Sequence, residues 1–488
     1  MALTLLMTAC AFARLGAGAI CLEKATTIPD GWQMLDEIPD PSTPMRFSIA
    51  LRQPEMHGLA SKILANGLLG MGDTRSLRTP AQDDVDHVME WLSSNGVSEA
   101  KVDTDWIRVA TTVGEANKLL DMQLRRYSYD GKKPILRAPE YNIPDSLDTA
   151  IDFIHPIANF MTPEHEVSVA PPLAEDAGLH RRDVACSPTT TPDCINKLYG
   201  INYTTPDGKS CIRFGIAGFL EQWANYDDTR RSFEHSRPDL VKAGYNFTLS
   251  VPKAYAIRVC NEIGMLTSRG VSVLSGSGDG GAKGGRNATC RSNDGSNKDM
   301  TISTFPASCP WVTSVGAVNN GQEPPNGSVF SSGGFSAYFE RPDWQDAAVS
   351  EYVDALNGHL EGYYNSSMRA VPDISAIGTR FQTVINGTPF MLDGTSASTP
   401  VLAGMIALVN DARVRQGKPV LGWLNERLYS DEVREVLQDI TAGQSFSCKF
   451  SGGKEPGGWP ATEGYDAITG LGVPNDFNKF MDVLVNMD

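Results

Sequence analysis

The chain has 488 residues, which is long enough for two or three domains that each bury a core of ordinary size. Its 58 Asp and Glu residues outnumber 42 Lys and Arg and give a net charge of −16; such a surface repels phosphate and anionic lipid, so we expect neither nucleic acid nor membranes as partners. With 41% apolar residues, 46 Gly and 30 Pro, the composition is typical of a globular protein rich in turns and excludes disordered and collagen-like chains.

Residues 1–19 have the features of a cleaved signal peptide. An apolar run of 12 residues, ALTLLMTACAFA, ends with the A-x-A pattern at residues 11–13, and the pattern recurs at 17–19. The alternative is a buried or frayed helix, because the Lys or Arg that usually precedes such a run is absent. Six N-x-S/T sequons lie downstream of residue 200 and agree with a secreted, extracellular glycoprotein. They begin at Asn202, Asn246, Asn287, Asn326, Asn365 and Asn386.

Two differently built regions follow. Short alternating strands and helix-like runs between residues 44 and 159 predict a small α+β unit without a catalytic constellation. Residues 160–185 are rich in Pro, Glu and Ala with no period, which predicts an exposed linker, and Arg181-Arg182 is an accessible place to cut. Beyond the linker, Gly-rich turns separate apolar strands that alternate with helices. We therefore expect an α/β domain over residues 183–488, a parallel sheet with helices on both faces.

Nine cysteines are present, and seven of them lie beyond the linker. Because seven is odd, in an oxidising compartment one thiol stays unpaired or its partner has been lost from the chain. No C-x-x-C pair occurs, so the cysteines do not suggest zinc.

The stretch GSGDGG, residues 276–281, matches the G-x-G-x-x-G pattern of dinucleotide sites. That interpretation requires an apolar helix after the third glycine to hold the pyrophosphate, but the polar loop AKGGRNATCRSNDGSN follows. We therefore reject a nucleotide cofactor. Ligands of α/β sheets bind where strands end, so we expect Asp279 to lie at the mouth of the sheet.

Ser396 lies in MLDGTSASTPVLAGMIALVN, where a Gly-Thr-Ser turn meets an apolar helical run. One interpretation is a helix cap, since Ser and Thr commonly cap helices. The other is an acyl-transfer nucleophile: small residues let a substrate backbone approach, the helix dipole favours negative charge, and Pro400 is expected in the first turn, where its missing N–H costs nothing. None of the seven His is followed by Gly-Thr, which favours a carboxylate base acting in acid beside a protonated Asp279 that donates to an oxyanion.

Six ordered segments carry a resemblance to a known family. They are SGSGDGG at 275–281, FPASCPWVTSVGAV at 305–318, FSSGGFSAYFERPDWQ at 330–345, RAVPDISA at 369–376, DGTSASTP at 393–400 and ATEGYDAITGLGVP at 461–474. In this order they resemble the sedolisins, the serine-carboxyl peptidases that include secreted fungal tripeptidyl-peptidases. The resemblance implies a subtilisin-like fold, peptide or protein substrates, Ser396 as nucleophile and Asp279 as the oxyanion aspartate. A looser resemblance implies that residues 20–182 are a propeptide-like domain and linker, with the propeptide as a partner of the peptidase.

The resemblance also implies a C-terminal calcium site, and the residues make chemical sense for it. Asp439 and Asp466 supply hard carboxylate oxygens, and the backbone carbonyls of Ile440 and Gly464, with Thr462 as a further candidate, complete an oxygen shell. The alternative for two such aspartates is a pair of turn or cap residues.

The chain departs from the family at the catalytic base. Sedolisins carry a Glu and, four residues later, an Asp on one helix face; the Glu takes the serine proton and the Asp orients the Glu. Here residues 243–250 run directly into 251–264, whereas the family has several dozen residues between the counterparts, including that helix. The only Glu-x-x-x-Asp beyond the linker is Glu435 with Asp439, which the calcium site already uses. We therefore expect part of the central sheet to be missing at a gap near 250/251, either in a natural inactive relative or through an exon dropped from the gene model.

Overall fold

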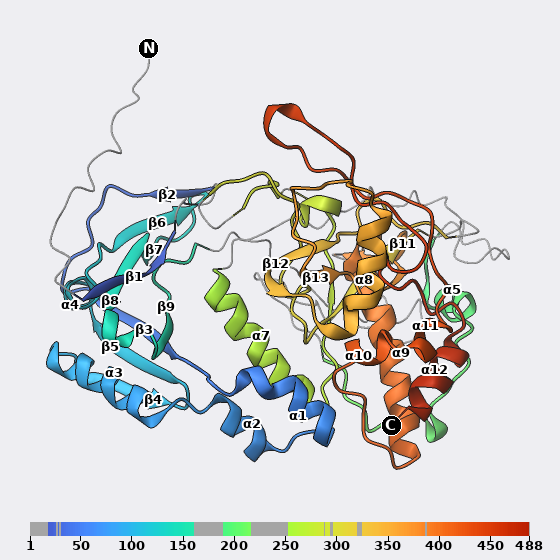
Figure 1. The fold of residues 1–488 in the computed structure, drawn as a ribbon, viewed down its shortest axis with the longest axis horizontal. Helices are drawn as coiled ribbons and strands as arrows, with labels where there is room; N and C mark the ends of the chain where they lie inside the picture. The colour runs from blue at the N-terminus through green and yellow to red at the C-terminus, as the bar shows by residue number, and fades with distance from the viewer. Residues whose placement is uncertain are drawn as a thin grey trace. The chain divides into compact units, whose positions relative to one another are not determined.

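The computed structural model describes residues 18–25, 28, 31–160, 189–215, 252–286, 288–292, 296–319, 325–385 and 388–487 (Figure 1). The chain divides into two compact units, one from Met1–Gly58 and Gly72–Thr162 and the other from Leu59–Met71 and Pro163–Asp488. Residues 1–17 of the predicted signal peptide and nearly all of the predicted linker lie outside the described residues. No helix within the described ranges is long and apolar enough to cross a membrane.

The N-terminal unit is built on a four-stranded antiparallel sheet in the order β4-β5-β3-β9. In β3, Phe47, Ile49 and Leu51 are buried in a core shared with Val88 of α3, so the period-two face of the strand meets one face of the helix. The α+β expectation is confirmed. The elements of this unit are β1 (Ala19–Lys24), β2 (Trp32–Met34), β3 (Pro44–Leu51), α2 (Met71–Arg78), α3 (Gln82–Ser94), β4 (Glu99–Asp103), β5 (Trp106–Thr112), α4 (Val113–Leu119), β6 (Arg125–Tyr129), β7 (Ile135–Arg137), β8 (Glu140–Pro144) and β9 (Ile151–His155).

The C-terminal unit contains a parallel sheet in the order β10-β11-β14. Its strands are β10 (Leu274–Gly276), β11 (Thr313–Val318) and β14 (Ile374–Ile377), and the long helix α9 (Thr395–Arg415) packs on all three. Every residue of β11 and β14 is buried, as expected for parallel strands covered on both faces. Val401 and Met405 of α9 share one core with Val315 and Ile374 of the sheet. The α/β expectation is confirmed, whereas the loss of central strands concerns residues near 216–251, outside the described part, and stays a prediction.

The remaining elements of this unit are two antiparallel strand pairs and shorter helices. The pairs are β12 (Gly334–Glu340) with β13 (Met368–Val371) and β15 (Phe381–Ile385) with β16 (Thr388–Leu392). The helices are α1 (Leu59–Asn66), α5 (Pro192–Leu198), α7 (Lys253–Ser268), α8 (Asp343–Ala355), α10 (Asn425–Leu428), α11 (Asp431–Arg434) and α12 (Phe477–Asn486).

Disulfides cross-link the C-terminal unit. They join Cys260 to Cys309 and Cys290 to Cys448. Cys194 is also disulfide-bonded, whereas Cys211 is free and exposed. Among the described cysteines beyond the linker, Cys211 is therefore the unpaired thiol that the odd count predicts. It precedes the predicted gap in the sequence, which agrees with a partner lost there.

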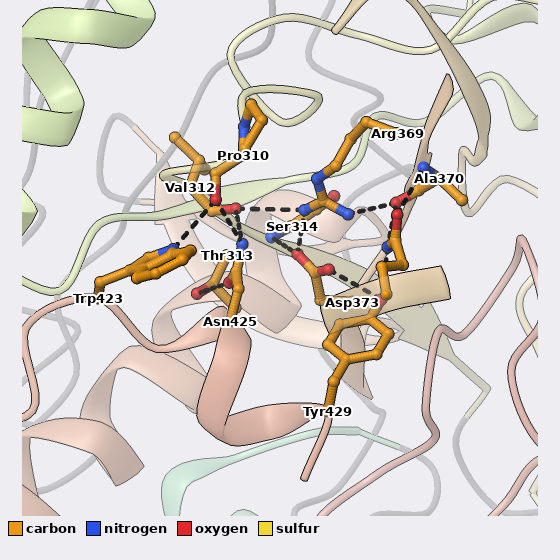
Figure 2. A network of polar contacts seen from close by, with 11 residues as sticks. Pro310, Val312, Thr313, Ser314, Arg369, Ala370, Asp373, Trp423, Asn425 and Tyr429 are labelled. Atoms are coloured by element: carbon orange, nitrogen blue, oxygen red, sulfur yellow. Dashed lines mark hydrogen bonds and ion pairs between the residues drawn. The ribbon is translucent and has the colours of Figure 1, made fainter. Parts of the chain in front are cut away.

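A buried polar network links β11 to the β13–β14 segment (Figure 2). The Arg369 guanidinium and the Asp373 carboxylate are both fully buried and form an ion pair at 2.7 Å. Asp373 also accepts hydrogen bonds from the Ser314 N–H at 2.8 Å and the Tyr429 hydroxyl at 3.0 Å. The guanidinium carbon of Arg369 lies 5.2 Å from the centre of the Trp344 ring. The RAVPDISA segment thus fixes the start of β14 against β11 through charge-assisted hydrogen bonds.

The same network holds the loop that leads into β11. Asn425 donates through Nδ2 to the carbonyls of Pro310 at 3.0 Å and Val312 at 2.9 Å, and it accepts from the Thr313 hydroxyl at 2.7 Å. Trp423 donates through Nε1 to the Pro310 carbonyl at 3.1 Å (Figure 2). These bonds tie the start of the central strand to the chain that follows α9.

Candidate active site

The turn between β16 and α9 brings Ser396 to the start of a long helix. α9 begins at Thr395 with Gly394 as its N-cap, and no side chain caps it. Ser396 is exposed, and its side chain has no hydrogen bond with any residue that the structure describes. The cap interpretation is therefore wrong, and the hydroxyl stands unengaged at the positive end of the helix dipole.

Pro400 is the sixth residue of α9, so the expectation that it lies in the first turn is wrong. The N–H that proline lacks would bond the carbonyl four residues earlier, which belongs to Ser396. The Ser396 carbonyl therefore loses its usual intrahelical donor. The difference arises because the helix starts directly after Gly394 rather than closer to the proline.

Asp279 follows β10 and lies against the same turn. Its Oδ1 accepts hydrogen bonds from the Thr395 N–H at 2.8 Å and from the Thr395 hydroxyl at 3.0 Å. Two glycines allow this approach, since a Cβ on Gly394 would lie 2.9 Å from Asp279 Oδ2 and a Cβ on Gly276 would lie 2.8 Å from Thr395 Oγ1. The structure thus brings Asp279 and Ser396 together from segments far apart in the sequence.

Burial raises the pKa of Asp279 above its ordinary value, although 24% of the side chain stays exposed. Protein surrounds the carboxyl on most sides, so burial is the main cause of this shift. Hydrogen bonds from Thr395 and the charge of Arg286, whose Nη2 lies 3.5 Å from Oδ2, oppose this pKa shift without reversing it. The net direction keeps Asp279 protonated to a higher pH than an ordinary aspartic acid. Sequence reasoning missed Arg286, because nothing in its polar loop marks it as a partner of Asp279.

Among the described residues, no carboxylate or imidazole is hydrogen-bonded to Ser396. Asp393 is exposed and accepts a hydrogen bond from the Arg380 N–H at 2.6 Å. His359 bonds a backbone carbonyl through Nε2 at 2.8 Å, and Glu435 is exposed at the C-terminal end of α11. The described residues therefore offer a candidate nucleophile and a candidate oxyanion group without a bonded base.

Asp439 lies where two C-terminal loops meet. Its Oδ2 accepts a hydrogen bond from the Gly464 N–H at 2.7 Å, whereas its Oδ1 is buried and has no partner in the described part of the chain. The carbonyls of Ile440 and Gly464 likewise accept no hydrogen bond from described residues. Burial raises the pKa of Asp439, opposed by the N–H groups of Gly464 and Ile440 and reinforced by Glu463. A buried carboxylate oxygen without a partner, beside free carbonyls, fits the oxygen ligands of a hard cation.

Asp466 differs because its hydrogen bonds are complete. Its Oδ1 accepts from the N–H groups of Ile468 at 2.8 Å and Thr469 at 2.9 Å, and its Oδ2 from the Thr469 hydroxyl at 2.9 Å. Burial raises the pKa of Asp466 to about 7, and the Asp439 charge adds to that shift. This geometry suits a turn residue as well as a ligand. Thr462 donates its hydroxyl to a backbone carbonyl at 3.3 Å. No group of three or more His, Cys, Asp or Glu gathers in the described ranges, so a cation here would rely on backbone carbonyls.

Two known families match parts of this chain, and solved structures resemble it weakly. The family described as "Pro-kumamolisin, activation domain" matches residues 30–160, and the one described as "Subtilase family" matches residues 261–444. Among solved structures, Pseudomonas sedolisin complexed with pseudo-iodotyrostatin is 20% identical, covers 49% of this chain and 64% of that chain, and has a TM-score of 0.34. That likeness is too weak for a comparison of site geometry.

Curated relatives match the chain along nearly its whole length. The tripeptidyl-peptidase sed4 of Aspergillus fumigatus is 32% identical over 596 positions, which cover 97% of this chain and 98% of the relative. The tripeptidyl-peptidase SED3 of Arthroderma otae is 29% identical over 564 positions, 93% of each. Because 97% of 488 residues is about 473, roughly 120 of the 596 positions in the first alignment face a gap in this chain. With this identity over almost all of the relative, the chain belongs to the sedolisin family of serine-carboxyl peptidases.

Proposed function

We propose that this chain represents a secreted, acid-acting serine-carboxyl peptidase of the tripeptidyl-peptidase type, with Ser396 as nucleophile and Asp279 in the oxyanion hole. The observation that carries the proposal is the bonding of Asp279 to Thr395, because it holds a carboxyl beside the helix end that presents Ser396. The names of the relatives support release of tripeptides from peptide or protein substrates. The activation domain makes the product of translation a zymogen.

In the proposed reaction, Ser396 Oγ attacks the carbonyl carbon of the scissile peptide bond and its proton passes to a carboxylate base. The carbonyl oxygen gains the negative charge. Asp279 Oδ1 already accepts two bonds from Thr395, so Oδ2 is the oxygen that carries a proton for donation to the oxyanion. One carboxyl has to be ionised and the other protonated, which requires two carboxyls of different pKa working in acid.

The alternative function is a catalytically inactive secreted glycoprotein on the same scaffold. The Glu and Asp of the sedolisin base are expected at the gap near 250/251. In the alignment with the first relative, 97% of the 488 residues of this chain spread over 596 positions, so roughly 120 positions have no counterpart in this chain. The free Cys211 agrees with a partner lost in the same stretch. These observations favour the inactive alternative for the chain as written and the peptidase for the chain with the stretch restored.

Sequencing the transcript across the codons for residues 249–252 separates a natural inactive relative from a shortened gene model. An in-frame insert encoding the Glu and Asp supports the peptidase. The restored chain should then release tripeptides from a fluorogenic peptide in acid, and Ser396→Ala should abolish that release. A restored chain without activity, or with activity that survives Ser396→Ala, contradicts the proposed function.

We also propose that the two C-terminal loops bind a calcium ion through Asp439, Asp466 and the carbonyls of Ile440 and Gly464. The buried Asp439 Oδ1 without a partner among the described residues supports this, as do the two carbonyls that accept no bond from them. The ion would neutralise the two carboxylates, whose negative charges repel each other, and would join the two loops. Its role is therefore stability of the fold rather than chemistry at Ser396.

A further inference from the structure

Residues 59–71 lie within the stretch that matches the activation domain, yet they fold as part of the C-terminal unit. Their helix, α1, lies beside α7 (Figure 1). Leu59 and Ile63, one turn apart on α1, are 0% and 8% exposed, and Leu69 is 7% exposed. Leu64 is 57% exposed, so the helix is amphipathic and its apolar face is covered.

A notch in α7 receives the start of this segment. A Cβ on Gly264 would lie 2.8 Å from Leu59 Cδ2 and 2.8 Å from Trp311 Nε1, so the missing side chain is the space that Leu59 and Trp311 fill. Farther along, a Cβ on Gly270 would lie 3.3 Å from Leu68 Cδ1. Gly264, in the last turn of α7, therefore leaves the space that Leu59 fills, whereas Gly270, two residues after the helix, leaves space that Val420 at 2.8 Å and then Leu68 approach.

The backbone makes a further bond. The Leu69 N–H donates to the Ser268 carbonyl at 2.7 Å. Ser268 is the last residue of α7 and is fully buried, and the final carbonyls of a helix have no intrahelical partner. Residues 59–71 thus satisfy a buried carbonyl that would otherwise require another donor.

We infer that residues 59–71 are an anchor that binds the activation domain to the peptidase unit and keeps it bound after the linker is cut. The partner is the chain's own propeptide, and the receptor surface is the C-terminal half of α7 with Trp311. The anchor uses none of the contacts of Asp279 and Ser396, so it holds the propeptide whether or not the chain is an active peptidase. Both ends of the segment continue into the N-terminal unit, so that unit cannot leave without withdrawing Leu59 and Leu69.

A full-length chain with a site-specific protease sequence in place of Arg181-Arg182 tests the anchor. After the cut at neutral pH, size-exclusion chromatography shows whether the two fragments elute together, as we expect for the otherwise unchanged chain. Leu59→Asp should separate them, since a carboxylate in an apolar notch weakens binding by about a hundredfold or more. Leu64→Asp is the matched control on the exposed face of α1, and the two fragments of this variant should elute together. Co-elution of the Leu59→Asp fragments, with native circular dichroism, would overturn the inference.

Hydrogen–deuterium exchange on the uncut wild-type chain keeps the test independent of how the variants fold. The bond from Leu69 to Ser268 predicts that the Leu69 amide exchanges far more slowly than an unstructured peptide. Exchange of residues 59–71 at the unstructured rate would overturn the inference by itself.

Discussion

Replacing Asp373 with alanine removes the acceptor at the centre of the buried network and leaves the Arg369 charge unpaired (Figure 2). The Ser314 N–H and the Tyr429 hydroxyl lose an acceptor at the same time. Removing one partner of a buried ion pair costs about 3–5 kcal/mol, and a buried donor left without an acceptor costs about 1–3 kcal/mol. The same atoms carry both penalties, so we expect the free energy of unfolding to fall by about 4 kcal/mol rather than by their sum.

Thermal unfolding followed by circular dichroism measures this loss. A change of that size lowers the melting temperature of a unit this large by roughly 10 °C. The control is Asp346→Ala, which breaks the Arg341–Asp346 pair at 2.8 Å; Asp346 is 62% exposed, and such pairs are worth at most about 1 kcal/mol. Replacing both Arg369 and Asp373 with leucine should restore much of the stability, because no buried charge remains.

The reasoning is refuted by either of two results. One is a fall of less than about 2 °C for Asp373→Ala, no larger than an exposed pair would give. The other is a double leucine variant that is no more stable than Asp373→Ala, because the unpaired Arg369 charge would then not be the main cost.

The chain as written should not hydrolyse peptides at any pH, since loss of the base from a serine-peptidase site lowers kcat by about six powers of ten; robust acid cleavage that Ser396→Ala abolishes contradicts this. In the restored chain, activity should peak in acid and fade as pH rises through the raised pKa of Asp279, because ionisation removes the donated proton. Asp279→Asn keeps a hydrogen-bond donor and Asp279→Ala loses it, so kcat of the alanine variant should be about 100-fold lower than kcat of the asparagine variant. Equal kcat values for the two variants would contradict the oxyanion role of Asp279. A calcium chelator should lower the melting temperature, because removing an ion present at 100 times its Kd lowers the free energy of unfolding by about 2.7 kcal/mol. Asp466→Ala should remove this sensitivity to the chelator. A folded protein that responds neither to chelator nor to added calcium would mark both aspartates as turn residues.

The sequence predicts the neighbourhood of the site better than its details. Asp279 closely follows a strand and Ser396 lies at the start of a helix, and such ends gather at one edge of a parallel sheet, so their approach can be expected from the order of elements. The start of α9 cannot, because Gly394 caps it without a side-chain bond and the apolar run does not mark the first helical residue. That is why Pro400 lies deeper in the helix than the sequence suggests.

Other features escape sequence reasoning because they depend on tertiary contacts. The position of Arg286 beside Asp279 is set by the path of a polar loop. The apolar face of α1 is visible in its periodicity, but the sequence does not say that α7 covers it. The odd cysteine count predicts an unpaired thiol, and only the geometry identifies Cys211.

The two disulfide loops of the C-terminal unit overlap, since Cys290 lies between Cys260 and Cys309 in the chain. Closing the Cys290–Cys448 loop, with a sequence separation of 158, removes chain entropy worth about 5 kcal/mol from the unfolded state, as much as the whole stability of a marginal domain. Protein made in a reducing bacterial cytosol would lack that contribution, and Cys211 would offer a free thiol for wrong pairing on later oxidation. Recombinant protein therefore has to be made by secretion or in the periplasm. Inactivity of a cytosolic preparation would reflect its missing disulfides and would not test the role of Ser396.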